Sequence, residues 1–271
     1  MKIRLLFLSI LSLLALSCEE RISWPRSSEQ LTVIAVEGVL TNENINQVIK
    51  ISLPYQDMNG TPAPVSGATV EVSDGSTTFG FAEFPPLSGE YYSVKMRAVF
   101  GKTYTLHIHV NGKDFYAQDH SVPVEPLNPI SYQKSGSDST RYKLNFSESG
   151  SGANYVVHEL DWQGTASCLA SQTCTATLVY YDLKTIDVNE VFKPAKKELF
   201  FPAGTTIIRR KFSVSPAYQE FLRTVLSETE WRGSVFDVQR TNATTNFSDG
   251  AIGFFAVATV LSDTTVIVEK P

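Results

Sequence analysis

The stretch GKTYTLHIHVNGKDFYAQ, residues 101–118, has the most regular pattern in this chain. Apolar residues stand at every second position on both sides of Asn111-Gly112, at Tyr104, Leu106, Ile108, Val110, Phe115 and Ala117. Successive side chains of a strand point to opposite faces of a sheet, and Asn-Gly favours a two-residue type I′ turn. The stretch therefore predicts a β-hairpin with one buried face and one polar face.

Three stretches upstream have a similar composition. They are LTVIAVEGVL (31–40), INQVIKISL (45–53) and PAPVSGATVEVSDG (62–75), which are rich in β-branched residues and turn signals. Short strands separated by turns are typical of an antiparallel β-sandwich. We therefore expect a mainly β fold in which residues 31–121 form an N-terminal Ig-like or prealbumin-like sandwich.

A proline-rich stretch at residues 122–130 predicts a linker to a second domain at residues 131–271. The second domain is also rich in β-forming stretches, namely RYKLNFSES (141–149), NYVVHELDW (154–162), TATLVYYDL (175–183), TTIIRRKFSV (205–214) and IGFFAVATVL (252–261). The expected architecture is thus a β-sandwich followed by a second β-rich domain.

One segment of the second domain predicts a helix, at about residues 216–231. Tyr218, Phe221, Leu222, Val225 and Leu226 have the spacing of a single helical face. Ser215 before this run suits a helix cap, Pro216 suits a first turn and Gly233 suits the end. We expect this amphipathic helix to cover a sheet.

The N-terminus has the layout of a secretory signal, expected to span residues 1–17. Lys2 and Arg4 precede an apolar run whose helical length of about 18 Å is too short for roughly 30 Å of hydrocarbon. The small residues before Cys18 resemble the lipobox of bacterial lipoproteins, in which this cysteine is acylated. We therefore expect lipidation at Cys18, followed by a tether at residues 18–30.

The charge balance argues against nucleic acid as a general partner. The chain has a net charge of −5, and removal of the signal segment with Lys2 and Arg4 makes it more negative. Nucleic-acid binding depends on excess positive charge.

Cys168 and Cys174 are the cysteines that remain beside Cys18. A close pair in an exported chain predicts a disulfide. The pair lacks the additional cysteines or histidines of a zinc site.

His107 and His109 are two residues apart on the predicted hairpin, so both point to its polar face. The turn sets Asp114 opposite His109, and two histidines with a carboxylate could hold zinc. The alternative is a solvated polar face, which we favour, so these three residues remain weak metal candidates.

Other polar and aromatic groups have ordinary structural explanations. The basic clusters Lys193, Lys196, Lys197 and Arg209 to Lys211 are expected to be solvated, although they could meet an anionic partner. His120 and His158 are isolated. Tyr91, Tyr92, Tyr180, Tyr181, Trp162 and Trp231 could stack on a ligand, but we favour roles in the core.

Asp249, Gly250 and Gly253 form a structural motif near the C-terminus. Asp249-Gly250 suits a turn, and Gly253 within a strand indicates a bulge or a close backbone approach. The chain has no nucleophile elbow, zinc-protease motif or phosphate loop, so no catalytic residue and no cofactor are predicted.

Five of these stretches in this order resemble a known family. VIAVEGVLTNE, PVSGATVEVSDG, GKTYTLHIHVNGKDFYA, AYQEFLRTVLSETE and NFSDGAIGFFAVATV together are similar to the Bacteroidetes outer-membrane lipoproteins catalogued as domain of unknown function 4249. Two stretches depart from the usual pattern, at Asn246-Phe247 and at AIGFF. The resemblance implies an accessory role beside TonB-dependent outer-membrane receptors in nutrient capture.

We therefore expect a non-enzymatic lipoprotein in the outer membrane, at the cell surface or on the periplasmic leaflet. It is expected to be a binding or accessory subunit of a TonB-dependent transporter, with the partner surface on its second domain. The alternatives are a hydrolase of surface polymers and a structural or adhesive lipoprotein.

Overall fold

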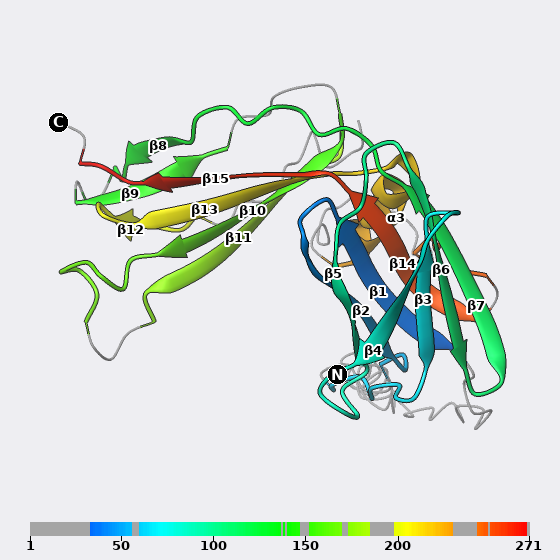
Figure 1. Ribbon diagram of the computed structural model, residues 1–271. Coiled ribbons are helices and arrows are strands. Elements are labelled where there is room, and N and C mark those ends of the chain that lie inside the picture. The colour runs from blue at the N-terminus through cyan, green and yellow to red at the C-terminus, as the bar shows by residue number, and fades with distance from the viewer. Residues whose placement is uncertain are drawn as a thin grey trace, which may run out of the picture. The chain divides into compact units, whose positions relative to one another are not determined.

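The computed structural model describes residues 33–55, 60–136, 138, 140–146, 152–169, 173–184, 198–229, 243–248 and 250–269. These residues form three β-sheets and one helix (Figure 1). The expected fold class, mainly β with one amphipathic helix, is confirmed. The signal segment, the tether and Cys18 lie outside the described residues. No helix within the described ranges has the length and apolarity to span a membrane.

The first sheet has eight strands in the order β14-β1-β2-β5-β4-β3-β6-β7. Its neighbouring strands pair antiparallel except β1 and β14, which pair parallel. The strands are β1 (Ile34–Thr41), β2 (Ile45–Ser52), β3 (Thr69–Ser73), β4 (Thr78–Glu83), β5 (Glu90–Met96), β6 (Thr103–Val110), β7 (Lys113–His120) and β14 (Ala251–Ala258).

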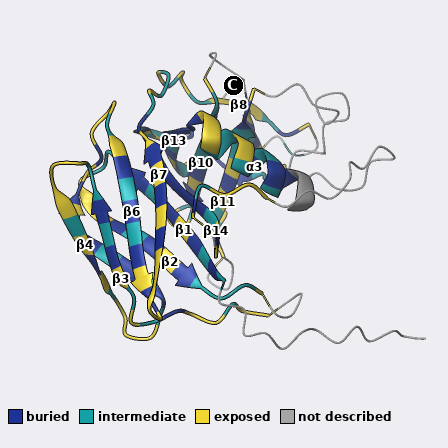
Figure 2. Ribbon diagram, turned by 90° about the vertical axis from the view of Figure 1, so that its right-hand side faces the viewer, coloured by how far each residue is buried: buried dark blue, intermediate teal, exposed yellow. Residues whose placement is uncertain are grey.

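The predicted hairpin is confirmed as β6 and β7. Asn111 and Gly112 have φ values of 51° and 71°, as the two central residues of a type I′ turn require. All six apolar residues predicted for the inner face are buried, and their neighbours along each strand are more exposed (Figure 2). The alternation of the sequence therefore fixes which face of the hairpin meets the core.

The strands β4 and β5 are not among those that the sequence predicts. Gly80 interrupts the pattern in β4, and Pro85-Pro86 follow the strand, so this region has few of the usual strand signals. Tyr91 of β5 is buried, and its hydroxyl donates to the Val65 carbonyl at 2.8 Å. Tyr91 is therefore a core residue that ties β5 to the loop before β3.

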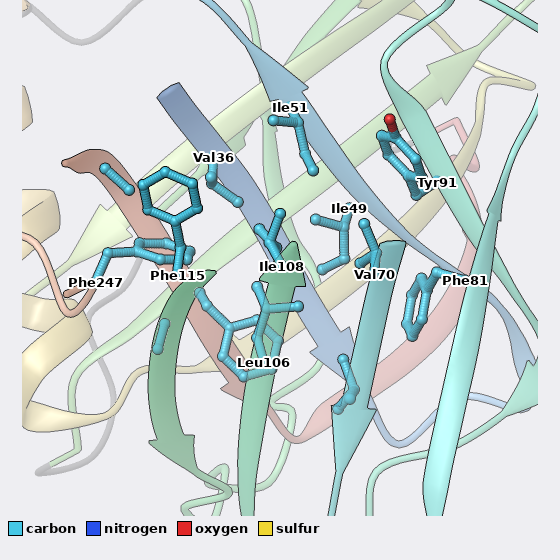
Figure 3. Packing of buried hydrophobic residues seen from close by; sticks show 14 of the residues in the cluster. Val36, Ile49, Ile51, Val70, Phe81, Tyr91, Leu106, Ile108, Phe115 and Phe247 are labelled. Carbon is cyan, nitrogen blue, oxygen red and sulfur yellow. The ribbon is translucent and has the colours of Figure 1, made fainter. Parts of the chain in front are cut away.

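Buried side chains of the first sheet form one hydrophobic cluster. Figure 3 shows Val36, Ile49, Val70, Ile108 and Phe115 facing one another from five strands. Burial of apolar surface is the main favourable contribution to folding, so this cluster is the principal source of stability for the first sheet.

The segment at residues 243–248 links the two end strands of this sheet, β7 and β14. The Asn246 amide nitrogen donates to the carbonyls of Gln118 at 3.0 Å and Phe255 at 2.8 Å, and its oxygen accepts from the Phe255 N–H at 3.1 Å. Phe247 is buried beside Phe115 in the cluster (Figure 3). Asn246 is thus one of the side chains that join the ends of the strand order.

The second and third sheets lie downstream of the linker region. The second has the antiparallel order β11-β10-β13-β15, and the third has the order β12-β9-β8. Their strands are β8 (Ser131–Lys134), β9 (Arg141–Asn145), β10 (Asn154–Asp161), β11 (Thr175–Asp182), β12 (Phe201–Pro202), β13 (Thr206–Ser213) and β15 (Val260–Val266). Buried apolar residues from both sheets share a core.

The predicted helix is α3 (Pro216–Thr229). The Ser215 hydroxyl accepts from the Tyr218 N–H at 3.2 Å, which confirms the expected N-cap. The rings of Tyr218 and Phe221 contact Phe254 of β14 with centroids 5.1 Å away, whereas Leu222 and Leu226 pack with residues of the second sheet and its flanks, so the predicted helical face contacts both large sheets. Gly233, the expected end, lies outside the described residues.

The expected second domain is wrong for residues 251–258. These residues are β14 of the first sheet, and the chain then continues through Thr259 into β15 of the second sheet (Figure 1). The described residues from 33 onward belong to one compact unit. Parallel pairing of β1 with β14 spans most of the sequence, so no local pattern near residue 250 could reveal it.

Candidate functional site

Two features of the described residues are candidates for binding. The first, here called the apolar groove, lies on the outer face of β3, β4 and β5 in the first sheet. The second, here called the polar pocket, lies on the inner face of the four-stranded sheet.

The apolar groove is bordered by large side chains that the core does not use. Phe84 is 69% exposed and Val94 is 70% exposed, and the partly buried Tyr92 lies on the same face. Glu71 of β3 lines the groove and supplies a carboxylate at its edge, and it pairs with His107 of β6. The groove therefore presents apolar side chains on rigid strands, with a polar rim.

The floor of the apolar groove is made of small residues. Gly80 pairs with Glu71, and Ala82 pairs with Tyr92. A Cβ added at Gly80 would have no atom within 4 Å, so the space above this glycine is open. Gly80, which weakens the strand signal of β4 in the sequence, therefore also leaves open space on this face of the sheet.

The polar pocket encloses about 70 Å³ between the second sheet, the end of β9 and residues 127–131. Strand pairing assembles its charged wall: His158 of β10 lies opposite Arg209 of β13, and Asn154 lies opposite Asp182 of β11. Lys211 follows Arg209 on the same face because side chains two apart on a strand share a face.

Arg209 is fully engaged within the pocket wall. Its Nε and Nη2 donate to the Asp263 carboxylate at 2.9 and 2.5 Å, and Nη2 also donates to the Asn128 carbonyl at 2.6 Å. The pair is bidentate, and Arg209 is only 9% exposed. The positive charge of Arg209 is therefore neutralised by the fold itself.

Asp182 is similarly paired. Its Oδ2 lies 2.6 Å from the Lys184 ammonium, and Asp182 itself is buried. The partner of this carboxylate is thus a neighbour two residues along the chain.

Lys211 has no such partner. The side chain is 5% exposed, and in the described part of the chain its ammonium makes no hydrogen bond or ion pair. Burial lowers the pKa of Lys211, and the charges of Glu125 and Asp182 act in the opposite direction. A charged group on a buried residue is unfavourable when it forms no hydrogen bond or ion pair, so Lys211 distinguishes the polar pocket from an ordinary core.

His158 also lacks one expected partner. The residue is 6% exposed, and its Nδ1 is buried without a hydrogen-bond partner among the described residues. Burial, with a smaller effect from Arg209, lowers the pKa of His158 to about 4. The imidazole is therefore neutral near pH 7.

The expectation that Arg209 to Lys211 form a solvated cluster is wrong for Arg209 and Lys211. Both are buried, whereas Arg210 points to the opposite face, pairs with Glu43 and lies 5.0 Å above the Phe212 ring. His158 is buried as well. Only the pairing of three distant strands brings these residues together, so a basic run in a strand gives no signal for the pocket.

The weak metal candidates do come together as the hairpin register predicts. His107 Nε2 and His109 Nδ1 both donate to Asp114 Oδ1, at 2.7 and 3.0 Å, and the His107 ring stacks on Tyr116 at 4.7 Å. The His107 and His109 hydrogen bonds lower the pKa of Asp114. Across the described ranges, no group of three or more His, Cys, Asp or Glu side chains is arranged to hold a metal ion.

The predicted disulfide is confirmed. Cys168 and Cys174 are bonded, with their Cα atoms 5.9 Å apart, and Cys174 is buried. The Trp162 N–H donates to the Cys174 carbonyl at 2.9 Å, so the bonded loop is attached to the end of β10.

The predicted close approach at Gly253 is also confirmed. Its φ is 94°, and a Cβ there would lie 2.0 Å from the Val36 carbonyl oxygen of β1. Gly250 has a φ of 91°, whereas Asp249 lies outside the described residues.

The remaining candidates divide between structural roles and undescribed positions. Trp162 packs against the second core, and Tyr180 lines the polar pocket and stacks on Phe146 at 5.1 Å. Lys193, Lys196, Lys197 and Trp231 lie outside the described residues.

Comparisons with known proteins identify a family and a distant structural likeness. The family model described as Domain of unknown function (DUF4249) matches residues 20–264. No curated protein matches the chain. A crystal structure of the chicken CNTN1 FN1-FN3 domains has 12% sequence identity and a TM-score of 0.27, and the match covers 66% of this chain and 61% of that chain.

Proposed function

The chain belongs to the DUF4249 family, and we propose that it is a lipid-anchored, surface-exposed accessory subunit of a TonB-dependent type outer-membrane transporter. The apolar groove carries this proposal. Exposed apolar side chains gathered on one face of a protein are typical of partner-binding surfaces.

The groove suits an apolar segment of a partner protein. Phe84 and Val94 at its border lie next to and within paired strands, so their backbone is already ordered before binding. We propose that an apolar loop of the transporter lies across Gly80 and Ala82 in the bound complex. The partner surface is then on the first sheet, not on the downstream domain that the sequence suggests.

The proposed anchor is compatible with this surface. The tether after Cys18 leads into β1, a strand of the sheet that carries the groove. Burial of acyl chains stabilises membrane attachment by about 0.8 kcal/mol per methylene, so two or three chains suffice to hold a soluble domain at a membrane.

Co-purification from native membranes tests the proposal. Gly80→Leu should fill the groove without disturbing the fold, because the space above Gly80 is open, and should abolish recovery of a β-barrel transporter. Gly136→Leu is the matched control, since a Cβ there also has open space, but outside the groove. The second control, Cys18→Ser, should release the protein from the membrane fraction.

Two results would contradict the proposal. Equal recovery of the transporter with Gly80→Leu and with the wild type would exclude the groove as the partner surface. Retention of Cys18→Ser in the membrane as an integral protein would exclude the lipid anchor.

A further inference from the structure

We propose that the polar pocket is a binding site for a small monocarboxylate, with Lys211 as its charged anchor and His158 as a neutral hydrogen-bonding group. This site is independent of the apolar groove, because it lies in the other large sheet and shares no residue with it.

The argument begins with the charge that the fold leaves unused. Arg209 is paired with Asp263, and Asp182 is paired with Lys184. Lys211 alone among the charged lining residues has no partner in the described part of the chain. Glu125 and Asp182 act on Lys211 through their charges but form no hydrogen bond or ion pair with it, so a bound anion can be its direct partner.

The same balance limits the charge of the ligand. Lys211 offers one unpaired positive charge, so a monoanion balances it, whereas a dianion such as phosphate would leave a negative charge in the pocket without a partner. A carboxylate accepts hydrogen bonds through two oxygens and can therefore contact both an ammonium and an imidazole N–H. Lys211 and His158 lie on adjacent paired strands of one face, so both are available to one ligand.

The remaining walls favour a short organic body. Leu127, Phe146, Val156 and Tyr180 line the pocket beside the polar groups. A volume of about 70 Å³ admits a ligand of a few heavy atoms. A mixed pocket with few convergent polar groups is typical of small-molecule sites.

Acetate titration of the full chain in detergent tests this site by NMR of its histidines. The chain has four histidines, so selective ¹³C labelling gives a simple spectrum. We expect a saturable shift of the His158 signal and unchanged signals from His107, His109 and His120. The expected dissociation constant is on the order of 1 mM, as for a single charged contact.

Lys211→Met should reduce acetate affinity at least about tenfold while keeping the length of the side chain. Without acetate this variant should melt at the same temperature as the wild type or higher, because it removes a buried unpaired charge. Lys95→Met is the control, because Lys95 is an exposed strand lysine, and it should leave acetate binding unchanged.

The anion series decides the ligand class. Inorganic phosphate should bind more weakly than acetate because its second negative charge would have no partner in the pocket, and chloride should fail to reproduce the shift of His158. An equal response to chloride, the absence of a saturable shift, or acetate binding that survives Lys211→Met would overturn the proposal.

Discussion

At the scale of single residues, Asp119 shows how a buried carboxylate can connect several elements. It lies on the inner face of β7, is 5% exposed, and its Oδ2 accepts from the Val257 N–H of β14 at 2.8 Å. The Ser215 hydroxyl, which caps α3, donates to the same carboxylate. One side chain thus joins two strands and a helix terminus.

Asp119 should make the fold less stable as the pH rises. Burial raises the pKa of Asp119 above its ordinary value of 3.8, although hydrogen bonds from Val257, Ser215 and His120 oppose this effect. The folded state therefore binds the proton more tightly, and stability falls as the pH rises from the unfolded pKa through the folded pKa. Urea unfolding across this range should show Asp119→Asn gaining stability relative to the wild type with rising pH.

A carboxylate with the opposite shift provides the control for this pH dependence. Hydrogen bonds from His107 and His109 lower the pKa of Asp114, so that the stability it contributes is lost as the pH falls through its folded pKa. Asp114→Asn should therefore lose stability relative to the wild type as the pH rises from the folded pKa of Asp114 to its unfolded value. A difference between Asp119→Asn and the wild type that does not change with pH would contradict the assignment to Asp119.

At the scale of elements, sequence patterns predict those strands and helices whose formation depends on residues close together in the chain. The hairpin follows from alternation and the Asn111-Gly112 turn, and α3 follows from its apolar face and the Ser215 cap. The β4 and β5 pair is missed because Gly80 breaks the alternation. The sequence locates the close approach at Gly253, but its partner strand β1 is too distant in sequence to be identified.

Gly253→Ala should weaken the pairing of β1 with β14. The alanine Cβ would clash with the Val36 carbonyl, and an L-residue with a φ of 94° is itself strained. We expect a loss of about 3 kcal/mol in the free energy of unfolding, measured by urea denaturation. Gly80→Ala should change the stability by less than about 0.5 kcal/mol, because its Cβ meets open space. Equal effects of the two substitutions would refute the role of the close approach.

At the scale of the whole molecule, connections between the two large sheets explain why a division at the proline-rich linker is incomplete. Thr259, between β14 and β15, donates through Oγ1 to the Val122 carbonyl at 2.8 Å and exchanges hydrogen bonds with Ser213. Asn42, after β1, accepts from the Val260 N–H at 2.7 Å and donates to the Val260 carbonyl at 3.2 Å. The contacts of Asn42 join residues from opposite ends of the sequence, which an analysis of successive stretches treats separately.

The polar pocket escapes prediction from the sequence for a related reason. Its polar residues occupy alternate positions in β10, β11 and β13, where each one alone resembles an ordinary outward residue. Their burial becomes evident only when β8 and β9 and residues 127–131 cover that face. Chemistry that depends on which strands are neighbours cannot be inferred from the spacing within one strand.

The contacts of Asn42 predict that the two large sheets unfold together. In urea, the NMR signals of His107 and His109 report on the first sheet, and the signal of His158 reports on the second. In the full chain carrying Cys18→Ser, both reporters should have the same midpoint, because the described residues from 33 onward form one compact unit.

Asn42→Ala should lower both midpoints together, by about 2 kcal/mol in the free energy of unfolding, because it removes two hydrogen bonds and leaves the Val260 backbone unpaired. Asn145→Ala removes an exposed hydrogen bond to Ser131 and should change stability by less than about 0.5 kcal/mol. Separate midpoints for the two reporters, or a shift of only one of them in Asn42→Ala, would show that the sheets are independent domains. A common shift of both midpoints would instead show that the two sheets unfold as one unit. Because binding to a folded state stabilises every part that unfolds with it, a ligand in the polar pocket would then also stabilise the sheet that carries the apolar groove.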